Sequence, residues 1–179
     1  MDEVRTVVSR DGTTIVYERY EGHGTGAGRG PAVVLVGEVP LARLLARSFP
    51  VFVYGGGSAG PYTVERELEG LAAVLEAAGP GVLALAAAAA GLPVGAVSVF
   101  EPPYAMPALP LEDAAAPVLV VDGGASPAPV RRAARALAAS LPRGRHRTLT
   151  GQIHEVAPHV LAPVLAEFVT EVTEAVEVA

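Results

Sequence analysis

The residue best suited to acid–base chemistry in this sequence is His154, in the segment 145–156. The pattern there predicts a short strand over 145–149, a turn at Gly151, and a helix that begins soon after the histidine. An imidazole exchanges its proton near neutral pH, and a loop between a strand and a helix leaves the ring accessible. His154 is therefore the first candidate for a catalytic residue; the alternative is a histidine that only caps the last helix.

A candidate nucleophile is Ser58, because residues 56–60 match the pattern Gly-x-Ser-x-Gly directly after a buried apolar run. With Asp122 and His154 it stands in the chain order of nucleophile, acid and base. A serine at a nucleophile turn needs its helix to begin at once, however, and here two residues separate the glycines from the predicted helix cap at Thr63. The simpler interpretation of Ser58 is a serine in a glycine-rich loop.

Four further side chains are candidates, and three of them, Asp122, Glu101 and Tyr54, stand where predicted strands end. Asp122 either orients His154 or caps a turn with the two glycines that follow it. Glu101 follows a buried strand, and is either a general acid or base or a salt-bridged structural carboxylate. Tyr54 and Tyr104 are candidate phenol donors, or they simply form the walls of a substrate cavity.

A metal site is not expected near His154. The nearest possible ligands are Glu155 and His159, but the two histidines are five residues apart, so they point to different helix faces, and Pro158 lies between them. His23 is expected in an exposed loop. His146 is similarly expected to be an exposed strand residue.

The composition excludes other chemistries. The chain has no Cys and no Lys, so a thiolate nucleophile, a lysine Schiff base and a phosphate-loop lysine are all ruled out. The glycine-rich segment 22–31 precedes a strand and does not open a helix, so we interpret it as a linker and not as a phosphate-binding loop. No cofactor is predicted. The net charge of −6 argues against a nucleic-acid surface.

The 179 residues are enough for one domain, 1–179, with a substantial core. The chain is 51% hydrophobic, with a mean hydropathy of +0.41, which indicates an apolar ligand cavity or subunit interface. The segment 77–100 has no charge, but prolines and glycines interrupt it, so we expect a buried helix and then a buried strand, with no membrane span. The charged N-terminus lacks the apolar core of a signal peptide, which predicts a cytoplasmic protein.

The predicted elements alternate along the chain. A hairpin turns at Asp11-Gly12, and continuous apolar strands follow at 32–36, 51–54, 94–100 and 118–121, with the strand 145–149 last. Helices are predicted at 41–47, from Thr63 to Gly79, over 82–90, at 129–141, and near the end of the chain. This order predicts an α/β fold with an open, mostly parallel sheet, helices on both faces and an N-terminal antiparallel hairpin. Ligands of such sheets bind where the strands end.

Several segments together resemble the α/β-hydrolase superfamily, especially its small bacterial members. They are the hairpin 9–18, the strand and glycine at 31–37, the segment 91–104, and the strand–helix pairs at 118–127 and 145–168. The resemblance implies a nucleophile serine on a turn at the place that corresponds to 78–85, where no Gly-x-Ser-x-Gly pattern stands. It also implies a lid after Tyr104. Only about a dozen residues separate Tyr104 from the next predicted strand, which is a loop-scale length, so the chain resembles a truncated member.

Three hypotheses follow from these patterns. The first is a non-hydrolytic enzyme in which His154, assisted by Asp122, moves a proton during cyclisation or isomerisation of a small apolar substrate of secondary metabolism. The second is an esterase-like hydrolase with Ser58, Asp122 and His154 as its triad. The third is a non-catalytic, ligand-binding pseudo-hydrolase. Because a second chain could cover a cavity that lacks a lid, we also expect a homodimer.

Overall fold

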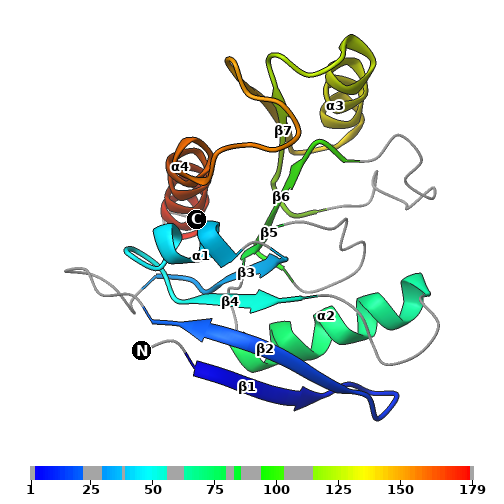
Figure 1. The fold of residues 1–179 in the computed structure, drawn as a ribbon, viewed down its shortest axis with the longest axis vertical. Helices are drawn as coiled ribbons and strands as arrows, with labels where there is room; N and C mark the ends of the chain where they lie inside the picture. Colours follow the sequence, from blue (N-terminus) through cyan, green and yellow to red (C-terminus); the bar gives the residue numbers. More distant parts are fainter. Residues whose placement is uncertain are drawn as a thin grey trace. The chain divides into compact units, whose positions relative to one another are not determined.

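A computed structural model of the chain describes residues 3–21, 30–37, 39–55, 63–79, 83–85, 94–102 and 115–177. The chain divides into two compact units, residues 1–85 and residues 86–179 (Figure 1). The strands and helices confirm the predicted α/β class, with an N-terminal antiparallel hairpin followed by parallel strand pairs.

The first unit begins with the predicted hairpin. Strand β1 (Glu3–Val8) pairs antiparallel with β2 (Thr14–Tyr20), and Val8 lies opposite Thr14. The turn between them contains Gly12 at φ +85°, a backbone conformation that glycine adopts without strain. The Asp11-Gly12 signal therefore predicted this turn correctly.

Three short strands continue the sheet of the first unit in the order β1-β2-β4-β3-β5. Strand β4 (Val51–Tyr54) pairs antiparallel with β2 and parallel with β3 (Val33–Val36), and β3 pairs parallel with β5 (Leu83–Leu85). The prediction of a helix over 82–90 is wrong for the residues of β5. A short run of Leu and Ala fits either structure, and pairing with β3 decides in favour of a strand.

Two helices belong to this unit, α1 (Val39–Leu45) and α2 (Val64–Ala78). The Thr63 side chain caps α2 by accepting a hydrogen bond from the backbone N–H of Arg66 at 3.3 Å, as the sequence predicted. The helix ends at Gly79, whose φ is +93°. Buried Leu71 and Val74 lie on α2, which packs against β1, β2, β3 and β4.

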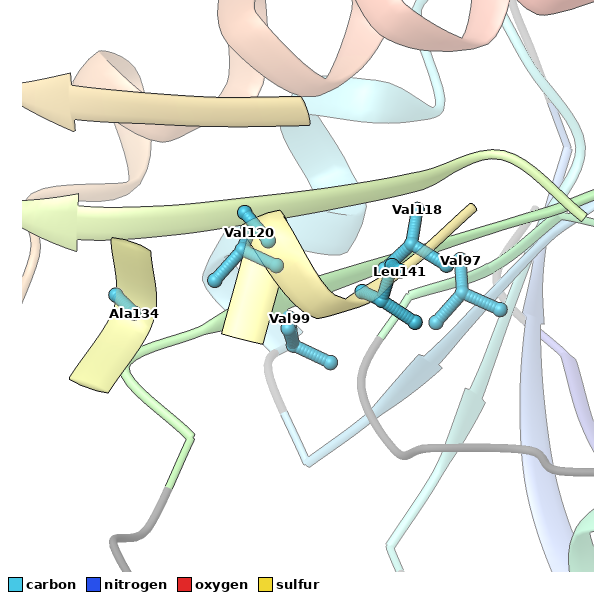
Figure 2. Packing of buried hydrophobic residues seen from close by; sticks show 7 residues of the cluster. Val97, Val99, Val118, Val120, Ala134 and Leu141 are labelled. Carbon is cyan, nitrogen blue, oxygen red and sulfur yellow. The ribbon is translucent and has the colours of Figure 1, made fainter. Parts of the chain in front are cut away.

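The second unit contains a parallel sheet with the order β6-β7-β8, formed by β6 (Ala96–Phe100), β7 (Val118–Gly123) and β8 (Gly144–Leu149). Helix α3 (Ala128–Ser140) joins β7 to β8, and α4 (Pro158–Glu177) follows β8. Figure 2 shows the core between the sheet and α3, made by Val97, Val99, Val118, Val120, Ala134 and Leu141. Each fully buried valine contributes about 1.5–3 kcal/mol, so this layer fixes the strand ends that carry the site.

The segment 77–100 was expected to lie within the protein and not in a membrane. Among the described residues, no helix has the length and apolar character that crossing a membrane would need.

Candidate functional site

The second unit holds a buried carboxylate at the end of its first strand. Glu101 directly follows β6, and its side chain is only 3% exposed. The carboxylate oxygen Oε1 accepts hydrogen bonds from the backbone N–H of Gly123, at 2.9 Å, and from the hydroxyl of Ser126. Glu101 also has a φ of +42°, in the left-handed region that side-chain-bearing residues rarely occupy. Such strain costs about 1–3 kcal/mol and persists where the surroundings fix it, often at functional sites.

His154 lies beside this carboxylate. Its ring nitrogen Nδ1 is 3.1 Å from Glu101 Oε2, although 53 residues separate the two along the chain. The imidazole is 78% exposed, and it stacks on the Phe100 ring with the centroids 6.3 Å apart and the planes 30° apart. The site thus joins a buried carboxylate, an accessible imidazole and one aromatic wall.

The loop that carries His154 is tied to the turn after β7 through Gln152. The backbone carbonyl of Gln152 accepts from the N–H of Ala125 at 3.0 Å, and its side-chain Oε1 accepts from the N–H of Ala157 at 3.1 Å, just before α4 begins. The turn after β8 uses Gly151 at φ +74°. Gln152 therefore holds both ends of the segment 150–157, the histidine loop, which carries His154.

Gly123 allows the two loops to approach each other. A Cβ atom at this position would lie 2.4 Å from the carbonyl oxygen of Gln152 and 2.8 Å from the Ser126 hydroxyl. Real Cβ atoms essentially never approach a backbone oxygen so closely. Position 123 therefore requires a glycine, and the backbone N–H of the same residue binds the Glu101 carboxylate.

The hydrogen bonds define what the pair can do chemically. When Glu101 is ionised its carboxylate only accepts, so Nδ1 of His154 donates to it, and a neutral ring then leaves Nε2 unprotonated. Among the described residues Nε2 has no hydrogen-bond partner, which leaves it available to a substrate. A histidine held this way can remove a proton, and the nearby carboxylate stabilises the imidazolium that forms.

Asp122, the expected partner of His154, is placed elsewhere. It lies inside β7, fully buried, and its Oδ2 is 2.8 Å from Nε2 of His146. The expectation that Asp122 assists His154 is therefore corrected: in this structure Glu101 contacts His154. Strand β7 extends through Gly123, so Asp122 shares a sheet face with Val120, and Val120 is the register partner of His146 on β8.

The same contact corrects the expectation for His146. Its side chain is only 23% exposed and contacts Asp122, whereas the sequence predicted an exposed strand residue. The Oδ1 atom of Asp122 is buried and has no hydrogen-bond partner among the described residues. The Asp122–His146 pair is thus a second carboxylate–imidazole contact, on β7 and β8.

The remaining predicted site residues are Tyr54, Ser58 and Tyr104. Tyr54 belongs to the first unit, where it is buried with its hydroxyl beside Gly70 of α2. Ser58 and Tyr104 lie outside the described residues. Within the described ranges, no group of three or more His, Asp or Glu side chains gathers in a way that could hold a metal ion.

Sequence reasoning missed three residues that support the site: Ser126, Gly123 and Gln152. A weak signal existed for the first two, since a Gly-Gly-Ala-Ser-Pro segment after a buried strand is typical of a tight turn before a helix. No local signal existed for the role of Gln152 between the loops, because its bond to Ala125 depends on how two loops meet.

Comparisons with solved structures agree with this architecture, while two other comparisons found no match. No family model matches the sequence, and no curated protein matches it either. An α/β hydrolase from Sphaerobacter thermophilus is 33% identical, with a TM-score of 0.75, and the alignment covers 92% of this chain and 99% of that one.

More distant structures share the fold. An esterase from Rhodococcus sp. ECU1013 is 15% identical, with 94% and 99% of the two chains covered and a TM-score of 0.72. A serine hydrolase without a lid from Xanthomonas campestris is 16% identical, with 97% and 94% covered and a TM-score of 0.72. The identity and coverage of the Sphaerobacter protein, together with this fold, show that the chain belongs to the α/β-hydrolase superfamily.

Proposed function

We propose that this chain is a small-molecule enzyme that works by acid–base catalysis, with His154 as the proton-transferring residue and Glu101 as the residue that orients it. The observation that carries the proposal is the 3.1 Å contact between an exposed imidazole and a carboxylate that is buried and held by two other donors. A catalytic base must be accessible on one side and fixed on the other, and this pair meets both requirements.

The reaction begins when Nε2 of His154 takes a proton from the bound substrate. The imidazolium that results lies against the Glu101 carboxylate, which stabilises its charge without taking the proton. Nε2 then returns the proton to another atom of the substrate. The Phe100 ring, stacked on the imidazole, gives the site an apolar side, which supports a small apolar substrate.

A non-hydrolytic reaction, such as cyclisation or isomerisation, is the first form of this proposal. Neither the segment 78–85 nor the five alanines at 86–90 contains a Ser, Cys or Asp, so no nucleophile stands where the family resemblance places it. Proton transfer within one oriented substrate needs no covalent intermediate, and orientation alone lowers the barrier by several kcal/mol (roughly 7–11 at most).

Ester hydrolysis with Ser58 is the second form. The pattern Gly-x-Ser-x-Gly at 56–60 follows β4 directly, and several structural neighbours are described as esterases or serine hydrolases. In this form Glu101, and not Asp122, takes the place of the acid beside the histidine. Ser58 would attack the ester carbonyl while His154 accepts its proton.

Labelling and turnover separate the two forms. The wild-type protein and the Ser58→Ala variant are treated with a fluorophosphonate probe and tested on nitrophenyl esters of increasing acyl length. If the wild type is labelled and active and Ser58→Ala is neither, the hydrolytic form holds. If neither protein is labelled, substrate screening turns to internal cyclisation and isomerisation.

The histidine itself is tested with a matched pair of variants, His154→Ala and His159→Ala. Both histidines are exposed and lie five residues apart, but only His154 contacts Glu101. Turnover of any substrate found should fall about 10²–10⁴-fold in His154→Ala and stay unchanged in His159→Ala. Equal turnover in both variants would rule out the proposal. Ligands that raise the melting temperature without being converted would favour the non-catalytic, ligand-binding hypothesis.

A further inference from the structure

Strand β1 forms the open edge of the sheet in the first unit. It pairs with β2 on one side, and on its other side the described residues provide no partner strand (Figure 1). Val4 and Val8 on this strand are 68% and 63% exposed, and Val16, which lies opposite Thr6 on β2, is 55% exposed. Alternation along the strands places all of them on one face of the hairpin. An exposed apolar face beside an unpaired edge is a site for pairing with another strand.

The hairpin fixes which backbone groups point outward. The N–H of Ser9 donates to the carbonyl of Thr13 at 2.9 Å, so Ser9 faces β2, and Val7, Arg5 and Glu3 must face it in the same way. The N–H and C=O groups of Val4, Thr6 and Val8 therefore point away from β2, toward the open edge. The backbone groups that point to the open edge therefore include those of the exposed residues Val4 and Val8.

Strand β8 of the other unit, unlike the residues of β1 that point to its open edge, carries charged side chains. On β8, Arg145 pairs with Glu171 of α4 at 2.5 Å, and Arg147 pairs with Glu167 of the same helix. Charged side chains on an edge strand discourage pairing with another chain. The residues of β1 whose backbone groups point to the open edge, Val4, Thr6 and Val8, are uncharged. The charged residues Glu3 and Arg5 have backbone groups that face β2, and their side chains pair with each other.

We propose that β1 pairs antiparallel with β1 of a second copy of this chain, about a two-fold axis at Thr6. In this register Thr6 lies opposite Thr6 of the second copy, and Val4 lies opposite Val8. Every outward N–H then meets an outward C=O, because all three opposed pairs are of the hydrogen-bonded type. Arg5 lies opposite Val7 and Glu3 opposite Ser9, so no like charges face each other. The surface is therefore complementary to itself, as a two-fold interface requires.

The first test is the association state, measured by sedimentation velocity over a concentration series. The wild type should form dimers, and Thr6→Pro should weaken the dissociation constant about tenfold or more, because it removes one outward N–H from each copy. The proline leaves the β1–β2 hydrogen bonds intact, since the Thr6 N–H does not face β2. Thr6→Val keeps the N–H and is the control: it should form dimers like the wild type. A wild type that stays monomeric up to about 1 mM, or a Thr6→Pro dimer of unchanged affinity, would overturn the proposal.

The second test reads the register through disulfides, which is possible because the chain has no cysteine. Opposed residues of a hydrogen-bonded pair have Cα atoms about 5.5 Å apart, within the range of roughly 4.4–6.8 Å that a disulfide spans. Thr6→Cys should therefore form a covalent dimer on mild oxidation. Val4→Cys and Val8→Cys should do so only when the two variants are mixed. Cross-linking of Val4→Cys by itself at the rate of Thr6→Cys would show another register and refute this one.

Discussion

Replacing Glu101 with Gln tests the orientation of His154 without requiring a known substrate. The amide keeps an oxygen for the Gly123 N–H and the Ser126 hydroxyl, and its NH₂ group then faces Nδ1 of His154. An NH₂ group only donates, so the imidazole must accept at Nδ1 and carry its proton on Nε2. The substitution thus moves the proton of the neutral ring from one nitrogen to the other.

The cost in stability should be modest. Hydrogen bonds to a charged group contribute about 1.5–3 kcal/mol, and neutral ones about 0.5–1.5, so the two retained bonds each weaken by about 1 kcal/mol. Removing a buried charge offsets part of this loss. The net destabilisation should be about 1–2 kcal/mol, or a fall in melting temperature of roughly 2–8 °C for a chain of this length. Turnover should fall on the order of 10⁴-fold, because the catalytic nitrogen no longer accepts a proton.

The tautomer is read from the ¹⁵N chemical shifts of the imidazole nitrogens in long-range proton–nitrogen spectra, recorded above the titration range of histidine. The wild type should show His154 protonated on Nδ1, and Glu101→Gln should show it protonated on Nε2. Assignment is direct, since the chain has four histidines and each can be replaced singly by Gln. An unchanged tautomer would show that Glu101 does not bind His154 in solution, and the proposed mechanism would fail.

Glu101→Ala serves as the control for a purely structural role. It leaves the buried Gly123 N–H and Ser126 hydroxyl without their acceptor, so it should cost about 2–6 kcal/mol, clearly more than Glu101→Gln. If both variants lose activity to the same extent while differing this way in stability, orientation of His154 is the cause. A loss of activity that follows stability alone would indicate that Glu101 only holds the loops together.

Three further predictions concern stability. Gly123→Ala should destabilise the protein by more than about 2 kcal/mol in urea titrations, because its Cβ meets the carbonyl of Gln152; an unchanged midpoint would contradict the packing. Hydrogen bonds from Ser9 and Thr13 lower the pKa of Asp11 from 3.8 to about 2, so its contribution is complete above pH 3.8 and is lost as the pH falls through 2. The stability advantage of wild type over Asp11→Asn should therefore shrink from about pH 5 to about pH 2, and a constant advantage would refute this cause. His146→Ala leaves Asp122 buried without its imidazole and should cost about 3–5 kcal/mol by calorimetry, and adding Asp122→Asn should recover part of that loss.

Local signals predicted the elements whose boundaries depend on nearby residues. The turn at Gly12 and the cap of α2 at Thr63 follow from the conformational freedom of glycine and from a side chain that binds its own helix. The strand β5 could not be predicted in this way. Its three residues are compatible with a helix, and a partner about fifty positions earlier in the chain, Val33–Leu35, decides the outcome.

The error at Asp122 has a similar origin. Its neighbours Gly123 and Gly124 indicate a turn, but pairing of Gly123 with Leu149 extends β7 past Asp122. Side chains alternate between the two faces of a sheet. Because β7 extends two residues further than predicted, Asp122 takes a fixed place on one face, where its carboxylate meets His146 and not His154. The sequence identified Glu101 and His154 separately as candidates, yet their contact depends on the ends of β6 and β8, which no local pattern relates.

The two hydrogen bonds that Gln152 accepts have a consequence for how the histidine loop moves. The amide protons of Ala125 and Ala157 are both bound to this residue, one through its backbone and one through its side chain. Exchange of these protons with solvent requires the loop to open, and the same opening takes His154 away from Glu101. The exchange rates at two alanines therefore report how often the site is assembled, and any ligand that holds the histidine in place should slow both to a similar degree.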